Sequence, residues 1–355
     1  MSAKQAARSV NSAGKSPASA PRGFDKDLAE LEAFAESLRL QPVPDAAQVA
    51  YLRKTLTHKS NFLVSKAARL VADAELLALL PDVLNAYDRF FTDAAKTDPQ
   101  CWAKDALSKA LVKLGHRTVA EYLRGMRHHQ MEPSFGPPVD TAGALRGTCT
   151  HALVDCPGIS DSDLLTALLE PLTDIDKTVR MEAARAIGQV GGVSAMLILR
   201  LRAMLGPGES AQEEPEVLGE VYRSLLSLEG AQAIPIVASR LEPGDDLAAE
   251  AAFALADLRT PEALKPLLAR LSEGPDTWFA AVLLSAIALT RLPEAIDFLV
   301  SLIERDGREA SAAIEAIGRL GPSAELRARI QQAVDQVGSP RLLQALRQHL
   351  PAPAE

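Results

Sequence analysis

The sequence predicts an all-α protein built as a solenoid of stacked antiparallel helix pairs. Apolar residues make up 47% of the 355 residues but aromatic residues only 4%, and the apolar share is largely Ala and Leu, which favour helices over strands. Short Ala-rich segments also recur along the chain, at steps of about 30 to 42 residues. Such a period is typical of arrays in which each repeat buries its apolar face against its neighbours.

The first elements predicted are a tail and a cap. Residues 1–24 are rich in Ser, Ala, Lys and Pro and hold almost no large apolar residue, so we expect a disordered N-terminal tail. From Asp25 to Leu40 apolar residues recur at helical spacing, and Pro42 and Pro44 end the pattern. Residues 25–46 are therefore expected to form a leading cap helix and a linker.

Residues 47–350 are expected to form a solenoid of about eight helix pairs, followed by a short tail over residues 351–355. The Ala-rich segments align on one apolar position each: Leu70, Leu111, Leu153, Ile187, Leu225, Leu255, Ile287 and Ile317. A Leu-rich segment precedes each of them, for example SAMLILRLRAML at residues 194–205. Alanines let one helix approach its neighbours closely, and leucines fill the space between repeats, which gives one continuous core.

One segment carries a resemblance to a known family. Residues 174–192, DIDKTVRMEAARAIGQVGG, resemble the second helix of a HEAT repeat with its lead-in. The chain thus resembles bacterial-type HEAT-repeat proteins, which implies a right-handed, armadillo-like superhelix, and its last repeats are similar to the short repeats of phycobilin lyase subunits. The resemblance also implies that Asp174 and Arg180 form a ladder with neighbouring repeats. The helices that begin near Asp246 and at Thr277 lack the arginine and depart from the pattern.

Charge and motifs exclude several function classes. The formal charge is −8, and residues 155–276 hold 21 acids against 10 basic residues, although residues 101–151 are mildly basic. Nucleic acid is therefore an unlikely partner, since phosphate binding needs a broad basic surface. The apolar run Phe279–Thr290 is too short to cross a membrane. The three cysteines and the lack of an export signal favour the cytoplasm. We find no catalytic motif and expect neither an enzyme nor a cofactor.

Thiols and imidazoles are concentrated in one region, which raises the question of a metal site. All three cysteines and four of the six histidines lie between positions 101 and 156: Cys101, Cys149, Cys156, His116, His128, His129 and His151. Adjacent His128 and His129 cannot share a helix face, and Ala-rich helices commonly bury a free cysteine as a small apolar residue. We therefore predict no metal site here.

The most unusual stretch is RHHQMEPSFGPPVDTAGALRGTC, residues 127–149. We expect one helix over residues 117–131 and the next over residues 140–154, with Asp140 as its N-cap and EPSFGPPV as an enlarged, proline-stiffened turn. Long loops of fixed shape often carry function, so this turn is a candidate partner-binding element.

Candidate contact residues lie in the turn and on the second helices of the pairs, which line the concave surface in HEAT solenoids. The partner-binding set predicted here is Trp102, Arg127, His128, Phe135, Arg146 and His151. Trp278 begins an Ala-rich helix as Trp102 does, and both rings could instead wedge the turns between repeats. Further residues of the same helix series that we expect on this surface are Lys104, Lys109, Arg185 and Tyr222.

These observations predict a non-enzymatic scaffold or adaptor that binds a protein partner through its concave face and enlarged turn. Two alternatives come from other classes. The short repeats leave open a tetrapyrrole lyase-like subunit or chaperone, and the solenoid leaves open a HEAT-like DNA glycosylase, which would need a basic concave face.

Overall fold

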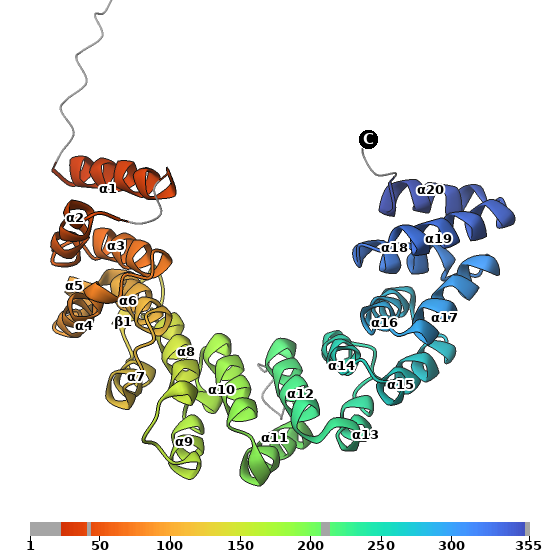
Figure 1. Ribbon diagram of the computed structural model, residues 1–355. Helices are drawn as coiled ribbons and strands as arrows, with labels where there is room; N and C mark the ends of the chain where they lie inside the picture. The colour runs from red at the N-terminus through yellow and green to blue at the C-terminus, as the bar shows by residue number, and fades with distance from the viewer. Residues whose placement is uncertain (1–22, 41–43, 207–213, 352–355) are drawn as a thin grey trace, which may run out of the picture.

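The computed structural model describes residues 23–40, 44–206 and 214–351. Of the tails predicted at 1–24 and 351–355, residues 1–22 and 352–355 lie outside these ranges. The described chain is all-α apart from one small hairpin, and its helices form an open arc with α1 (Gly23–Leu40) at one tip and α20 (Pro340–His349) at the other (Figure 1). Gly23 and Phe24, which we placed in the tail, already belong to α1.

The Ala-rich segments form an inner row that lines the concave side of the arc (Figure 1). Its helices contact one another in chain order, as the solenoid prediction requires. Before α20 they are α3 (Asn61–Asp73), α6 (Trp102–Lys113), α8 (Gly143–Ala152), α10 (Lys177–Val190), α12 (Pro215–Glu229), α14 (Asp246–Asp257), α16 (Thr277–Leu289) and α18 (Ala310–Arg319).

The Leu-rich segments form the outer row, and each packs on the inner helix that follows it. The outer helices are α2 (Ala46–Leu56), α4 (Leu80–Arg89), α7 (Val119–Met126), α9 (Asp161–Leu168), α11 (Gly192–Leu205), α13 (Ile234–Ala238), α15 (Pro261–Ser272), α17 (Pro293–Glu304) and α19 (Ala324–Val337). The short α5 (Ala94–Thr97) lies between α4 and α6. The pair α19 and α20 follows the eight segments aligned in the sequence.

Short 3₁₀ helices lie at several junctions between inner and outer helices. They are η1 (Leu77–Leu79), η2 (Pro99–Cys101), η3 (Leu153–Asp155), η4 (Pro171–Thr173) and η5 (Gly230–Gln232). The core is continuous: the aligned positions Leu111, Ile187 and Leu255 are fully buried in one apolar cluster that runs through the described repeats. Among the described residues, none of the helices has both the length and the apolarity needed to span a bilayer.

The segment predicted as an enlarged turn between two helices has a different structure from the one predicted. The first helix ends at Met126, not Met131, and residues 127–142 form an excursion that contains a β-hairpin of β1 (Met131–Glu132) and β2 (Val139–Asp140). The second helix begins at Gly143, and Asp140 does not cap it, because this carboxylate accepts the amide protons of Gln130 and Ala142 within the hairpin instead. The Pro-rich segment 133–138 is the hairpin loop.

Candidate protein-binding surface

Acid and base residues six positions apart anchor the loops that lead into the inner helices. Three such pairs do so, Asp98 with Lys104, Asp140 with Arg146, and Asp174 with Arg180, and in each of these three the basic member lies in the first turns of an inner helix. These pairs, together with Gln130, Glu132 and Glu214, form a continuous set of polar contacts that we call the polar spine.

The first part of the polar spine is a fully buried ion pair. Both Asp98 and Lys104 are 0% exposed, and their carboxylate and ammonium groups lie 2.9 Å apart. The Asp98 carboxylate also accepts the amide protons of Ala103 and Lys104 and a proton from the Asn61 side chain. Buried charges persist only when they are paired and hydrogen-bonded, so this carboxylate fixes the start of α6. The prediction that Lys104 is exposed on the concave surface was therefore wrong.

The same ion pair holds the base of the hairpin. The Lys104 ammonium donates to the Gln130 side-chain oxygen at 2.8 Å, and Gln130 donates in turn to Glu132 at 2.6 Å. Glu132 also accepts protons from the Gln100 amide and the Thr141 hydroxyl. Burial raises the pKa of Glu132, but these hydrogen bonds outweigh it and leave the pKa below its ordinary value. The hairpin is therefore rigidly attached to α6.

Arg146 occupies the centre of the polar spine. Its guanidinium binds both oxygens of Asp174, at 2.7 and 2.9 Å, and one oxygen of Asp140 at 2.7 Å. The side chain is 1% exposed, which corrects the prediction that Arg146 contacts a partner. Burial raises the pKa of Asp140, but the amides of Gln130 and Ala142, together with His129 and Arg146, lower it to about 2. Arg146 thus joins the hairpin, α8 and the next repeat.

The last part of the polar spine reaches a fourth repeat. Arg180 donates to the backbone oxygens of Asp174 and Ile175, and its guanidinium pairs with the carboxylate of Glu214 ahead of α12. Asp174 therefore pairs with Arg146 of the preceding repeat, and Arg180 with Glu214 ahead of the following repeat's inner helix. These contacts link the inner helices α8, α10 and α12 of three successive repeats.

Large apolar side chains are exposed in, or next to, the segments that carry the polar spine. We call the following set the edge ridge: Trp102, Met131, Phe135, Val139 and Ile175, which are 48% to 116% exposed. Phe135 at the hairpin tip has the highest exposure, 116%, and Ile175 beside Asp174 is 85% exposed. Because the polar spine joins these segments by hydrogen bonds and ion pairs, the backbone that carries these side chains is held in place.

Trp102 packs against the preceding repeat and is also partly exposed. Its ring packs against Phe62 of α3 at a centroid distance of 5.6 Å, and Phe62 packs against Phe24 of α1 at 6.2 Å. The indole thus bridges adjacent repeats, while 48% of its surface stays exposed at the start of α6. Gln100 and Cys101 just before it have left-handed backbone conformations (φ 62° and 54°), which direct the chain into α6.

Two other predicted contact residues are surface side chains that already have ionic neighbours. Arg127 is exposed and lies 3.3 Å from Glu170. His151 lies 3.4 Å from Glu182 on the next inner helix. Both stay accessible and are compatible with partner contact.

His128 is half-buried beneath the hairpin. Its ring contacts Phe91 edge-on, and its Nε2 atom lies 3.3 Å from the side-chain oxygen of Gln130. Burial lowers the pKa of His128, so the neutral ring is favoured. The ring of His128 thus packs within the fold, against Phe91 and Gln130, and only part of its surface is accessible to a partner.

Ion pairs join inner helices across the concave face. Arg185 of α10 binds Glu220 of α12 at 3.0 and 3.2 Å, and Arg223 of α12 binds Glu250 of α14 at 2.7 Å. Lys109 pairs within its own helix, with Asp105. The centre of the concave face therefore presents paired charges, not a free basic surface. Tyr222 is fully buried, which corrects its predicted exposure.

Apolar side chains replace these ion pairs beyond α14. Phe253, Trp278 and Val282 line a hollow of about 230 Å³ between α14, α16 and α18, together with Glu315 and Arg319 at its border. Trp278 is 49% exposed and stands at the same position of its repeat as Trp102, nine residues before the aligned apolar position. Each arm of the arc thus carries one accessible indole.

The three cysteines are buried, and none of them forms a disulfide bond. All three are free thiols in buried positions, and the Cys149 sulfur lies 3.6 Å from the Tyr87 hydroxyl. Burial raises the pKa of Cys101 and Cys149 to about 12 and that of Cys156 to about 11. In the described ranges, no three His, Cys, Asp or Glu side chains are grouped so as to hold a metal ion.

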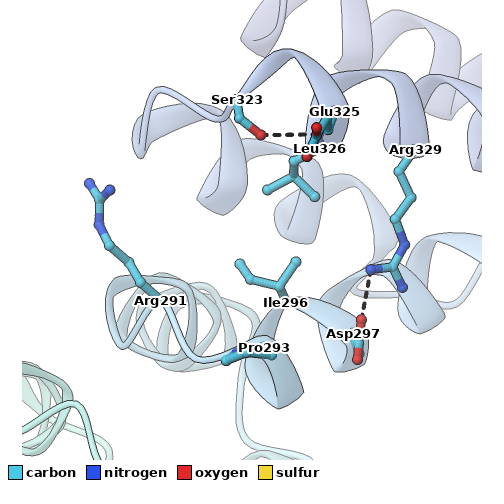
Figure 2. A pocket seen from close by; sticks show the side chains of 8 residues that line it. All are labelled: Arg291, Pro293, Ile296, Asp297, Ser323, Glu325, Leu326 and Arg329. Carbon is cyan, nitrogen blue, oxygen red and sulfur yellow. Dashed lines mark hydrogen bonds and ion pairs between the residues drawn. The ribbon is translucent and has the colours of Figure 1, made fainter.

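Figure 2 shows a further hollow, of about 330 Å³, between the outer helices α17 and α19. Ile296 and Leu326 extend into it from opposite sides, and Arg329 binds Asp297 at 2.7 Å. The Ser323 hydroxyl accepts the Leu326 amide proton as the N-cap of α19. Because these polar groups already satisfy one another, we assign the hollow to the packing of consecutive outer helices.

Comparison with protein-family profiles gives no match to this chain, and neither does comparison with curated protein sequences. Among solved structures, a crystal structure described as that of an engineered protein is similar with a TM-score of 0.37 and 18% identity, over 94% of this chain and 93% of that chain. At this level of similarity, any functional interpretation depends on the geometry of the chain itself.

Proposed function

We propose that this protein is a non-enzymatic scaffold or adaptor that binds a protein partner through the edge ridge and the adjoining concave face. The observation that carries the proposal is Phe135, a fully exposed aromatic ring at the tip of a hairpin whose base is buried and hydrogen-bonded. Exposed apolar groups on a soluble domain commonly mark interaction sites, and aromatic side chains dominate the binding energy of interfaces. A ring that is held in place before binding loses little conformational entropy when it binds.

The charges of the concave face support a protein partner over nucleic acid. Arg185 and Arg223 are already paired with Glu220 and Glu250, so these cations are not free to neutralise phosphates. Trp102 and Trp278 supply further apolar anchors on the two arms. The proposal includes a right-handed, HEAT-type superhelix and a cytoplasmic location, which the free thiols support.

The test compares two exposed positions with matched chemistry. Phe135→Ala combined with Met131→Ala removes two side chains of the edge ridge, whereas Leu77→Ala removes an apolar side chain that is 64% exposed at the start of η1. In pull-downs from native cell extract, the edge-ridge variant should lose the co-purifying protein at least about 10-fold, because hot-spot truncations cost upward of about 2 kcal/mol.

The Leu77→Ala control should retain the partner, and all variants should melt at the wild-type temperature because the removed side chains are exposed. Equal capture by wild type and edge-ridge variant would show that the hairpin is a structural insertion only. Arg146 is unsuitable for this test, since its removal would disturb the fold itself.

A further inference from the structure

Helix α11 exposes a straight row of large apolar side chains on its outer side. Val193, Leu197, Leu201 and Leu205 are 69%, 56%, 60% and 65% exposed, and Met204 beside them is 62% exposed. The first four are spaced four residues apart, so they lie on one line along the helix surface. We call these four residues the α11 ridge.

The outward faces of other outer helices are polar by comparison. α15 presents Glu262 and Lys265 to solvent, and α17 presents Glu294 and Asp297. The two arginines of α11 do not interrupt the α11 ridge: Arg200 is paired with Glu229, and Arg202 donates to the backbone oxygen of Gly206. An outward apolar line without charge is unusual for a surface that remains in water.

We propose that the α11 ridge is a homodimer interface, in which α11 of one chain packs against α11 of a second copy. A two-fold symmetric interface uses the same patch on both partners, so the patch must be self-complementary. Side chains spaced four apart form the very ridges that interdigitate in the commonest class of helix packing, with axes crossing at roughly −50°. Two copies of the α11 ridge therefore fit each other.

The size of the α11 ridge agrees with this occupant. Its side chains and Met204 are 56% to 69% exposed in each chain, so pairing two copies removes on the order of 1,000 Å² from water, the area at which specific interfaces begin. Interfaces at this low end of the size range are commonly transient, so we expect a reversible dimer.

The location of α11 keeps the other surfaces accessible. Figure 1 shows α11 in the outer row, at the convex side of the arc and midway between its tips. A dimer through this helix places two arcs back to back, with both concave faces turned away from the contact. This inference does not depend on the partner proposed above, because the α11 ridge and the edge ridge share no residue.

Sedimentation velocity of the full chain tests the inference. Wild-type protein should change from monomer to dimer as its concentration rises from about 1 to about 100 μM, the range in which a weak, reversible dimer populates both states. The double variant Leu197→Glu with Leu201→Glu should remain monomeric throughout, because it places two carboxylates where apolar side chains must meet. The matched control Leu77→Glu, 64% exposed elsewhere, should dimerise like wild type.

Helical content and melting temperature show whether the glutamate variant is folded. If it is not, Leu197→Ser with Leu201→Ser replaces it, and the dimer should then weaken at least about 10-fold. A wild-type chain that stays monomeric at about 100 μM overturns the inference, as does a dimer that the α11 variants leave intact. Monomeric wild type that instead binds phosphatidylcholine vesicles through α11 also overturns it, in favour of a lipid surface.

Discussion

The guanidinium of Arg146 and the carboxylate of Asp174 form a two-point ion pair between consecutive repeats, with distances of 2.7 and 2.9 Å and side chains only 1% and 7% exposed. The same guanidinium also binds Asp140 of the hairpin. One buried cation thus binds two mostly buried carboxylates, whose side chains are 12% and 7% exposed, so its loss should strongly affect the stability of the fold.

Arg146→Ala should lower the free energy of unfolding by about 3–5 kcal/mol, because it leaves Asp174 and Asp140 buried without their counter-ion. Arg146→Lys keeps the charge but cannot bind Asp174 at two points, so its loss should be smaller. Urea unfolding followed by circular dichroism measures both. A loss under about 1 kcal/mol for the alanine variant would mean that water replaces the pair at little cost.

Stability should fall in acid through Asp140. Its pKa is about 2 in the folded chain against 3.8 for an unperturbed carboxyl group, so its ionised form stabilises the fold above pH 4 and this contribution is lost as the pH falls toward 2. The contribution amounts to roughly 2 kcal/mol from a shift of this size. Melting curves from neutral pH to about pH 2 should therefore converge for wild type and Asp140→Asn. Parallel curves over that window would assign the acid sensitivity to other carboxylates.

Two buried helical glycines should respond oppositely to alanine. A Cβ on Gly125 would lie 2.3 Å from the Cys149 sulfur and 2.4 Å from the Tyr87 hydroxyl, whereas a Cβ on Gly147 would meet nothing closer than Glu182 at 3.5 Å. We expect Gly125→Ala to destabilise by about 1–3 kcal/mol through overpacking. Gly147→Ala should stabilise by up to about 1 kcal/mol through lower chain entropy in the unfolded state. Denaturant unfolding of the pair provides the comparison, and equal effects would refute the close contact of α7 with α8.

The inner helices could be predicted because their signal is local. Positions such as Ile187 and Leu255 recur among alanines that permit close helix contact, and the structure buries both fully. The hairpin could not be predicted with the same rule. Its strands are two residues long, and Gln130 and Asp140 owe their places to Lys104 and Arg146, which lie on inner helices.

Exposure was the least predictable property of the candidate site. Arg146 and Lys104 were expected on the surface because charged residues usually are, and only the acids six positions earlier reveal that they are paired. That spacing is visible in the sequence, but it does not by itself show that the two side chains are buried. The α11 ridge was missed for the opposite reason, since an apolar helix is expected to be buried.

The polar spine ends at Glu214, and this has a mechanical consequence. In the described residues, no ion pair joins α14 to α16 or α16 to α18, so these helices are held mainly by apolar packing, which has no preferred direction. Directional bonds resist sliding and twisting, whereas apolar contacts tolerate both. We therefore expect the inner helices α14, α16 and α18 to shift against one another more readily than α6, α8 and α10 do, while ion pairs such as Arg329 with Asp297 hold the outer row of the same arm together.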